Sequence, residues 1–81
     1  MLYIILANVF GEAYCPVATS GTKEGAGHYA AYYLDSDPAV ESVVIQWYEE
    51  FDAGDVTEIS IRGSVKLTTK DGAEEFRRSV E

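Results

Sequence analysis

The chain has 81 residues, a length that supports one hydrophobic core, so we predict a single domain over residues 1–81. Hydrophobic residues make up 47% of it and charged residues 25%, which is typical of a folded globular protein and excludes a disordered chain. Fourteen acidic residues against six basic ones give a net charge of −8, which disfavours nucleic acid or an anionic membrane as direct partners and favours a basic protein surface. A single cysteine, Cys15, excludes an internal disulfide and a cysteine cluster for zinc, so we expect a cytoplasmic protein.

The N-terminal residues 2–10 form an apolar run rich in β-branched and aromatic residues, and Gly11 ends it. The run lacks a basic flank and is too short to span a membrane, so we interpret it neither as a signal peptide nor as a transmembrane helix. Its length and composition predict a strand that is buried on both faces and central in its sheet.

Residues 11–27 contain four glycines and Pro16, which predicts a long irregular loop of the kind that often carries function. The following residues 28–34 alternate in the manner of a strand, and we prefer that interpretation. A helix is the alternative, because Tyr29, Tyr32 and Tyr33 also have helical spacing.

The main helix is predicted at residues 38–52. Cap residues in the segment 35–37 precede Pro38, which suits the first helical position, and Gly54 follows the last turn. Apolar residues recur there at i, i+3 and i+4 and form one stripe: Val40, Val43, Val44, Trp47, Tyr48 and Phe51. We therefore expect the side chains of Val40, Val44, Trp47 and Phe51 to be buried.

The C-terminal part predicts strands at residues 56–62 and 64–69, with Gly63 as a bulge or a turn between them. Four apolar residues are expected on one face of this strand structure: Ile59, Ile61, Val65 and Leu67. Ala73, Phe76 and Val80 then have the spacing of a short helix. The predicted fold is α+β: a small, mostly antiparallel sheet with one amphipathic helix at about 38–52 and a short C-terminal helix.

Residue types that support catalysis are few in this chain. Cys15 and His28 flank the glycine-rich stretch and could form a Cys–His pair, but a single cysteine or histidine is more often structural. The spacing Gly25-Ala26-Gly27 lacks the third glycine of a dinucleotide fingerprint and the Gly-Lys-Ser/Thr of a P-loop. We therefore predict a protein that is not an enzyme, without catalytic residues, metal ligands or a cofactor.

One segment resembles a known catalytic motif. The run Gly27-His28-Tyr29-Ala30-Ala31-Tyr32, followed by Trp47-Tyr48, Phe51-Asp52 and Val56-Thr57, is similar to the histidine box of ubiquitin-specific cysteine proteases. The resemblance implies His28 as a base and Asp52 as its orienting acid. Because the family's Cys box is absent, it implies a fragment or a non-catalytic relative of the palm of such a protease.

Acidic residues are concentrated in the middle of the chain. Between Lys23 and Arg62 there are nine acids and no base, whereas the rest of the chain has five acids and six bases. A folded protein that displays carboxylates at a density near that of DNA, about one charge per ~1.7 Å, can occupy a groove that binds DNA. The alternative is a solvated face that maintains solubility. The candidate partner-binding acids are Asp35, Asp37, Glu41, Glu49, Glu50, Asp52, Asp55 and Glu58.

The chain also contains six tyrosines, which are frequent at protein interfaces and can equally complete a small core. We expect Tyr14 and one of Tyr32 and Tyr33 to be exposed and to contact the partner.

In size, charge and compactness the chain is similar to the small acidic inhibitors that phages make against host defence systems, anti-CRISPR proteins among them. Such inhibitors share no motif, so this resemblance lies in composition. It implies a non-catalytic protein that binds and inhibits a nucleic-acid-binding protein or complex, as a nucleic-acid mimic or a steric blocker.

Overall fold

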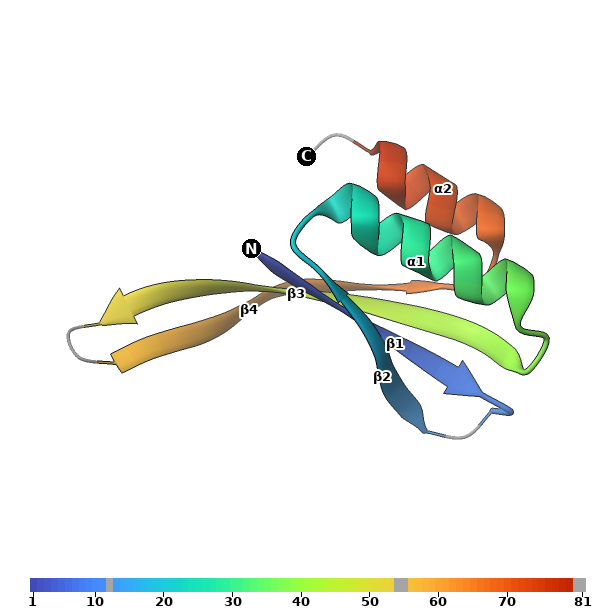
Figure 1. The fold of residues 1–81 in the computed structure, drawn as a ribbon, viewed down its shortest axis with the longest axis horizontal. Helices are drawn as coiled ribbons and strands as arrows, with labels where there is room; N and C mark the ends of the chain where they lie inside the picture. Colours follow the sequence, from blue (N-terminus) through green and yellow to red (C-terminus); the bar gives the residue numbers. More distant parts are fainter. Residues whose placement is uncertain (12, 54–55, 80–81) are drawn as a thin grey trace.

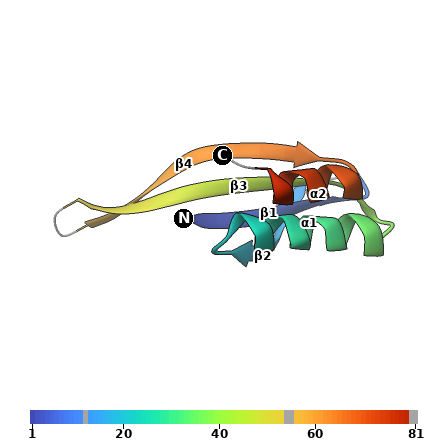
Figure 2. The same ribbon diagram turned by 90° about the horizontal axis from the view of Figure 1, so that it is seen from above.

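A computed structural model describes residues 1–11, 13–53 and 56–79, except for the side chains of residues 50–53 and 56–58. The elements in chain order are β1 (Leu2–Val9), β2 (Tyr14–Ser20), α1 (Lys23–Ser36), β3 (Val40–Ala53), β4 (Val56–Leu67) and α2 (Lys70–Arg78). The strands form one antiparallel sheet in the order β2-β1-β3-β4, and both helices cover the same face of it (Figures 1 and 2). The α+β class, the antiparallel sheet and the short C-terminal helix predicted from the sequence are confirmed.

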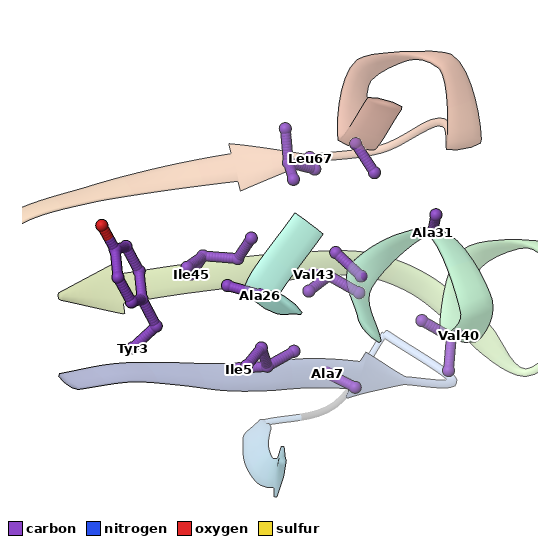
Figure 3. Packing of buried hydrophobic residues seen from close by; sticks show 11 residues of the cluster. Tyr3, Ile5, Ala7, Ala26, Ala31, Val40, Val43, Ile45 and Leu67 are labelled. Carbon is purple, nitrogen blue, oxygen red and sulfur yellow. The ribbon is translucent and has the colours of Figure 1, made fainter. Parts of the chain in front are cut away.

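The core lies between the two central strands and the helices (Figure 3). Alternate residues of β1 and β3 point into it, and Ile5, Val43 and Ile45 are fully buried there. Helix α1 covers them with the small side chains of Ala26 and Ala30, so the helix backbone lies close to the sheet. Burial of each large aliphatic side chain contributes roughly 1.5–3 kcal/mol, so these three residues stabilise the fold strongly.

Strand β1 is central in the sheet, as predicted, but its two faces differ. The residues facing the helices are buried, whereas Leu2, Ile4 and Leu6 are half-buried. Both described helices lie on the other side of the sheet, so the prediction of burial on both faces is correct for one face only (Figure 2). We call the side of the sheet away from the helices the open face.

The helix predicted at about 38–52 is wrong, because this segment is strand β3. Val40, Val43, Val44 and Ile45 are β-branched and favour an extended backbone. Both faces of the strand carry apolar residues, so it lacks the strict alternation of polar and apolar residues that marks a half-exposed strand, and the helical spacing is coincidental. Val40 is buried as expected, whereas Val44 and Trp47 are half-buried. The side chain of Phe51 lies outside the described residues.

The apparent helix cap before this segment is a turn between α1 and β3. The backbone N–H of Ala39 donates to Asp37 Oδ1 at 3.0 Å, and the N–H of Val40 donates to the Asp37 carbonyl oxygen at 3.1 Å. Aspartate makes such local bonds in turns as readily as at helix N-termini. Asp37 and Pro38 therefore turn the chain from the helix into the strand.

Residues 28–34 belong to helix α1, so the preferred strand interpretation is wrong and the helical alternative is correct. Thr22 caps the helix, since its side-chain oxygen accepts from the Gly25 N–H at 3.1 Å. Gly27 lies against α2, and a Cβ atom there would come within 2.6 Å of the Arg77 Cβ. This glycine permits close packing of the two helices, which is why a glycine-rich sequence forms a helix here.

The long loop predicted at residues 11–27 is also wrong. It contains strand β2 and the first turn of α1, and Glu12 lies outside the described residues. Strand β2 is at the edge of the sheet, where Pro16 can be accommodated because one side of an edge strand needs no hydrogen bonds.

Gly63 marks a bulge within one continuous strand, β4, rather than a turn. Trp47 pairs with Gly63 and Tyr48 with Ile61, so Arg62 is the extra residue. A Cβ atom at Gly63 would overlap the Trp47 indole, which explains the glycine. Because the bulge adds one residue, the side chains of β4 before it point to the opposite face from the one that simple alternation predicts. Ile61 therefore shares the open face with Tyr48. The prediction that Ile59 and Ile61 share a face with Val65 and Leu67 is therefore wrong.

Helix α2 packs beside α1 and above β4. Ala73 is buried, and the centroids of the Phe76 and Trp47 rings are 6.0 Å apart. Arg77 and Arg78 are in the last turn, as predicted, where the helix dipole favours positive charge. Val80 lies outside the described residues.

Candidate interaction surface

The β3–β4 hairpin extends beyond the rest of the sheet. Leu2, the first residue of β1, pairs with Tyr48, so residues 49–53 of β3 and 56–60 of β4 pair with one another without a third strand among the described residues. Figures 1 and 2 both show this hairpin projecting past the helices and past the N-terminus. We call residues 49–60 the arm; its residues 54–55 lie outside the described chain.

The arm contains five of the predicted acids and no basic residue. Glu49, Glu50, Asp52 and Glu58 lie on its two strands, and Asp55 falls outside the described residues. Glu49 forms an ion pair with Arg62, which lies just beyond the arm, and both side chains are about half exposed. Because Arg62 offsets one charge, the hairpin from residue 49 to 62 carries a net charge of −4. The side chains of Glu50, Asp52 and Glu58 lie outside the described residues.

The other three predicted acids lie at the opposite end of β3. Asp35 and Asp37 are at the C-terminal end of α1, and Glu41 is the second residue of the strand. Nine residues separate Glu41 from Glu50 along β3, a distance of roughly 30 Å at about 3.3 Å per residue. The eight candidate acids therefore do not form one surface: they divide into the arm and an end group of Asp35, Asp37 and Glu41.

The end group is held by local contacts. Asp35 Oδ2 lies 3.6 Å from Lys70 Nζ, and the Asp37 side chain accepts the turn hydrogen bond from the Ala39 N–H. Exposed ion pairs of this kind contribute little energy, but they reduce the charge offered to a partner. The arm is thus the better candidate for contact with a basic surface.

Tyr14 is 36% exposed, as expected, at the first residue of β2. Its hydroxyl lies 2.8 Å from Ser42 Oγ on β3, so the side chain reaches across β1 on the open face. The hydrogen bond with Ser42 holds the pKa of Tyr14 below its ordinary value of 10.0, and the positive charge of Lys66 contributes.

The tyrosines of α1 form an aromatic surface on the outer side of that helix. Tyr32 is 58% exposed, whereas Tyr33 is half-buried and its hydroxyl donates to the Val17 carbonyl oxygen at 3.4 Å. Tyr29 is also exposed, and together with His28 these residues line a shallow depression of about 260 Å³. The strand interpretation of residues 28–34 leaves Tyr29 out of the candidate residues. Its i, i+3 spacing from Tyr32 is the signal that predicts the two side chains on one helix face.

The residues considered for catalysis lie on different elements. His28 is exposed on α1, and Asp52 is on the arm. Cys15 Sγ lies 3.9 Å from the Ala13 carbonyl oxygen, and no hydrogen bond among the described residues joins it to His28. Within the same part of the chain, no three His, Cys, Asp or Glu side chains gather in a way that could hold a metal ion.

No known protein family matches this sequence, and neither the curated proteins nor the solved structures contain a significant match to it. No helix among the described residues is long and apolar enough to cross a membrane.

Proposed function

We propose that this protein is a non-catalytic inhibitor that binds a nucleic-acid-binding protein or complex and blocks access of the nucleic acid. The observation that supports the proposal best is the arm: two strands that project from the body and contain four acidic residues without a base. The partner is the basic surface that normally holds nucleic acid, and the protein binds no nucleic acid itself.

The density of charge on the arm is close to that of one nucleic-acid strand. Each of its two strands has five described residues, which span about 17 Å at ~3.4 Å per residue. The four acids on these strands give one charge per ~4 Å, close to the ~3.4 Å axial spacing of phosphates along one strand of DNA. Because Arg62 offsets Glu49, the arm imitates a single strand better than a duplex.

The arm also has an apolar residue available for contact. Ile59 is 61% exposed on its second strand. Charge acts mainly on association rate and partner choice, whereas affinity depends on a few desolvated side chains. We therefore expect the acids to direct the arm into a basic groove and Ile59 to supply buried contact area there.

The compositional resemblance to anti-CRISPR proteins supports the same class of partner. We propose a nuclease complex of a host defence system in the cytoplasm, held through the surface that binds its guide or its target. The aromatic surface of α1, with Tyr32 exposed, is available for a second contact.

Two variants of equal charge test the proposal. The arm variant is Glu50→Gln, Asp52→Asn and Glu58→Gln, and the end variant is Asp35→Asn, Asp37→Asn and Glu41→Gln. Each removes three acids and changes the net charge from −8 to −5, so a nonspecific effect of charge is the same in both. The amide in Asp37→Asn keeps the oxygen that accepts from Ala39.

Each protein is immobilised and used to recover partners from lysate of a host with a nuclease-based defence system. We expect the wild-type protein and the end variant to recover a nucleic-acid-binding complex. The arm variant should recover at least roughly tenfold less of it, and added salt should lower the amount recovered. Equal recovery by the arm variant, or recovery of a partner without a nucleic-acid site, would contradict the proposal.

A further inference from the structure

The open face of the sheet is unusually apolar for a surface without a covering layer. In an antiparallel sheet with helices on one side, the other side normally carries polar residues. Here Ile61 is 57% exposed, and the apolar residues beside it on the central strands are half-buried. Within the body of the sheet, the apolar residues of the open face on β1, β3 and β4 are Leu2, Ile4, Leu6, Val44, Tyr48 and Ile61.

These residues are neighbours across the strands. Leu2 pairs with Tyr48, which pairs in turn with Ile61, and Leu6 pairs with Val44. The polar atoms among them are bonded within the face, since the Tyr48 hydroxyl donates to Gln46 Oε1 at 2.8 Å. These six residues therefore form a continuous apolar surface across β1, β3 and β4.

Charge is absent from most of this surface. Strands β1 and β2 contain no charged residue, and neither does the segment 42–48 of β3. Lys66 is the one charged side chain among the described open-face positions opposite that segment, and its aliphatic stem can lie along apolar neighbours. Outside the arm and the end group, the acids that the structure describes lie on the helices: Glu24 on α1 and Asp71, Glu74 and Glu75 on α2.

This distribution of charged residues indicates which molecule can cover the open face. A chain of charge −8 repels a second copy wherever acids face acids, and the open face is where two copies meet without that repulsion. We propose that the open face is the contact surface for a second copy of this chain, with the two sheets packed face to face about a two-fold axis. In such a contact each residue meets the same patch on the other copy, and sheets pack about 10 Å apart.

The size of the open face fits this proposal. Four strands about 4.8 Å apart and the eight residues of β1 at about 3.3 Å each give a projected area of roughly 500 Å². This is below the ~800 Å² per partner of a standard interface, so we expect a weak dimer that forms in the micromolar range. A dimer would carry two arms, and this inference stands independently of what the arms bind.

Two substitutions of matched exposure test the dimer. Ile61→Lys places a charge on the open face, and Tyr32→Lys places the same charge on the helix side, where the side chain is 58% exposed against 57% for Ile61. Both wild-type side chains are already mostly in water, so neither change should unfold the monomer, and circular dichroism checks this. Sedimentation equilibrium over about 1–100 µM then measures the dimer.

We expect the wild-type protein to sediment at twice its mass of 8.9 kDa at the upper end of that range. Ile61→Lys should raise the dissociation constant by roughly tenfold or more, and Tyr32→Lys should leave it unchanged. Isotope-filtered NMR should show contacts between copies at the methyl groups of Ile4 and Leu6. A wild-type monomer at ~100 µM, or dissociation by Tyr32→Lys but not by Ile61→Lys, would overturn the proposal.

Discussion

The body of the protein and its arm have the same two strands but different surroundings. In the body, β3 lies between β1 and β4 beneath two helices, and Val43 and Ile45 are fully buried. In the arm, β3 and β4 pair with each other alone among the described residues, and Ile59 is mostly exposed. The first part of the hairpin therefore stabilises the fold, and we propose that its second part presents charge to a partner.

This difference is already visible in the charges of the sequence. The segment 42–48 has none, and the next ten residues have five acids. Because a charged side chain is costly to bury, the uncharged part can enter a core and the acidic part must remain in water or meet a basic surface. We expect substitutions in the two parts to have separable effects, on stability in the body and on binding in the arm.

The largest expected effect is on the core. Ile45→Ala should lower the free energy of unfolding by about 2–5 kcal/mol, because it removes buried contacts and leaves a cavity. Ile59→Ala in the arm should change it by no more than about 0.5 kcal/mol, since this side chain is largely in water. Urea denaturation of both variants measures the difference, and equal losses would contradict the division between body and arm.

A smaller effect is expected where the body passes into the arm. Gly63→Ala forces a Cβ atom into the Trp47 indole and should cost about 1–3 kcal/mol. Because Trp47 is the single tryptophan, its fluorescence should shift as the ring moves. Gly21→Ala is the control, since a Cβ there has nothing within 4 Å. A fluorescence spectrum unchanged by Gly63→Ala would show that the bulge does not depend on the glycine.

Loss of a helix cap should have an effect of about 1 kcal/mol. Thr22→Ala removes the oxygen that accepts from the Gly25 N–H at the start of α1. The exposed Thr68 is the comparison, and Thr68→Ala should change the free energy of unfolding by less than about 0.5 kcal/mol. Thermal unfolding compares them, and equal stability of the two variants would count against the cap.

The smallest effect concerns the open face at high pH. Since the pKa of Tyr14 lies below 10.0 in the folded chain, its ionised form favours the folded state. At a pH well below the folded pKa the phenol is protonated in both states and contributes nothing. The contribution appears as the pH rises through the folded pKa, and it is fully present above the unfolded value. NMR of the tyrosine ring carbons should show Ser42→Ala moving the Tyr14 pKa up toward 10.0, and no movement would contradict the assigned cause.

Several parts of the fold could be predicted from the sequence because local and tertiary preferences agree there. The apolar run of β1 and the helical spacing of Ala73 and Phe76 both correspond to observed elements. Residues 40–52 could not be placed correctly, because a strand with two apolar faces has no alternating pattern. The signal against a helix was the β-branched run Val43-Val44-Ile45, which a strand accommodates better.

Prediction of the candidate site from the sequence has the same limits. Its acidic residues could be found by counting charges. Their division into two groups depends on β3 being extended, since a helix with the same number of residues would be less than half as long as the strand. The open face could not be found at all, because Ile61 reaches it only through the bulge at Gly63. Tertiary pairing sets both features, and no local pattern encodes them.

The central claim is that the arm occupies a surface meant for nucleic acid. The most direct measurement is displacement of fluorescent DNA or RNA from the recovered complex by the wild-type protein, the arm variant and the end variant at two salt concentrations. We predict that the wild-type protein and the end variant displace the nucleic acid at similar concentrations, whereas the arm variant needs roughly tenfold more and high salt weakens all three. Displacement by the arm variant at the wild-type concentration would contradict the account.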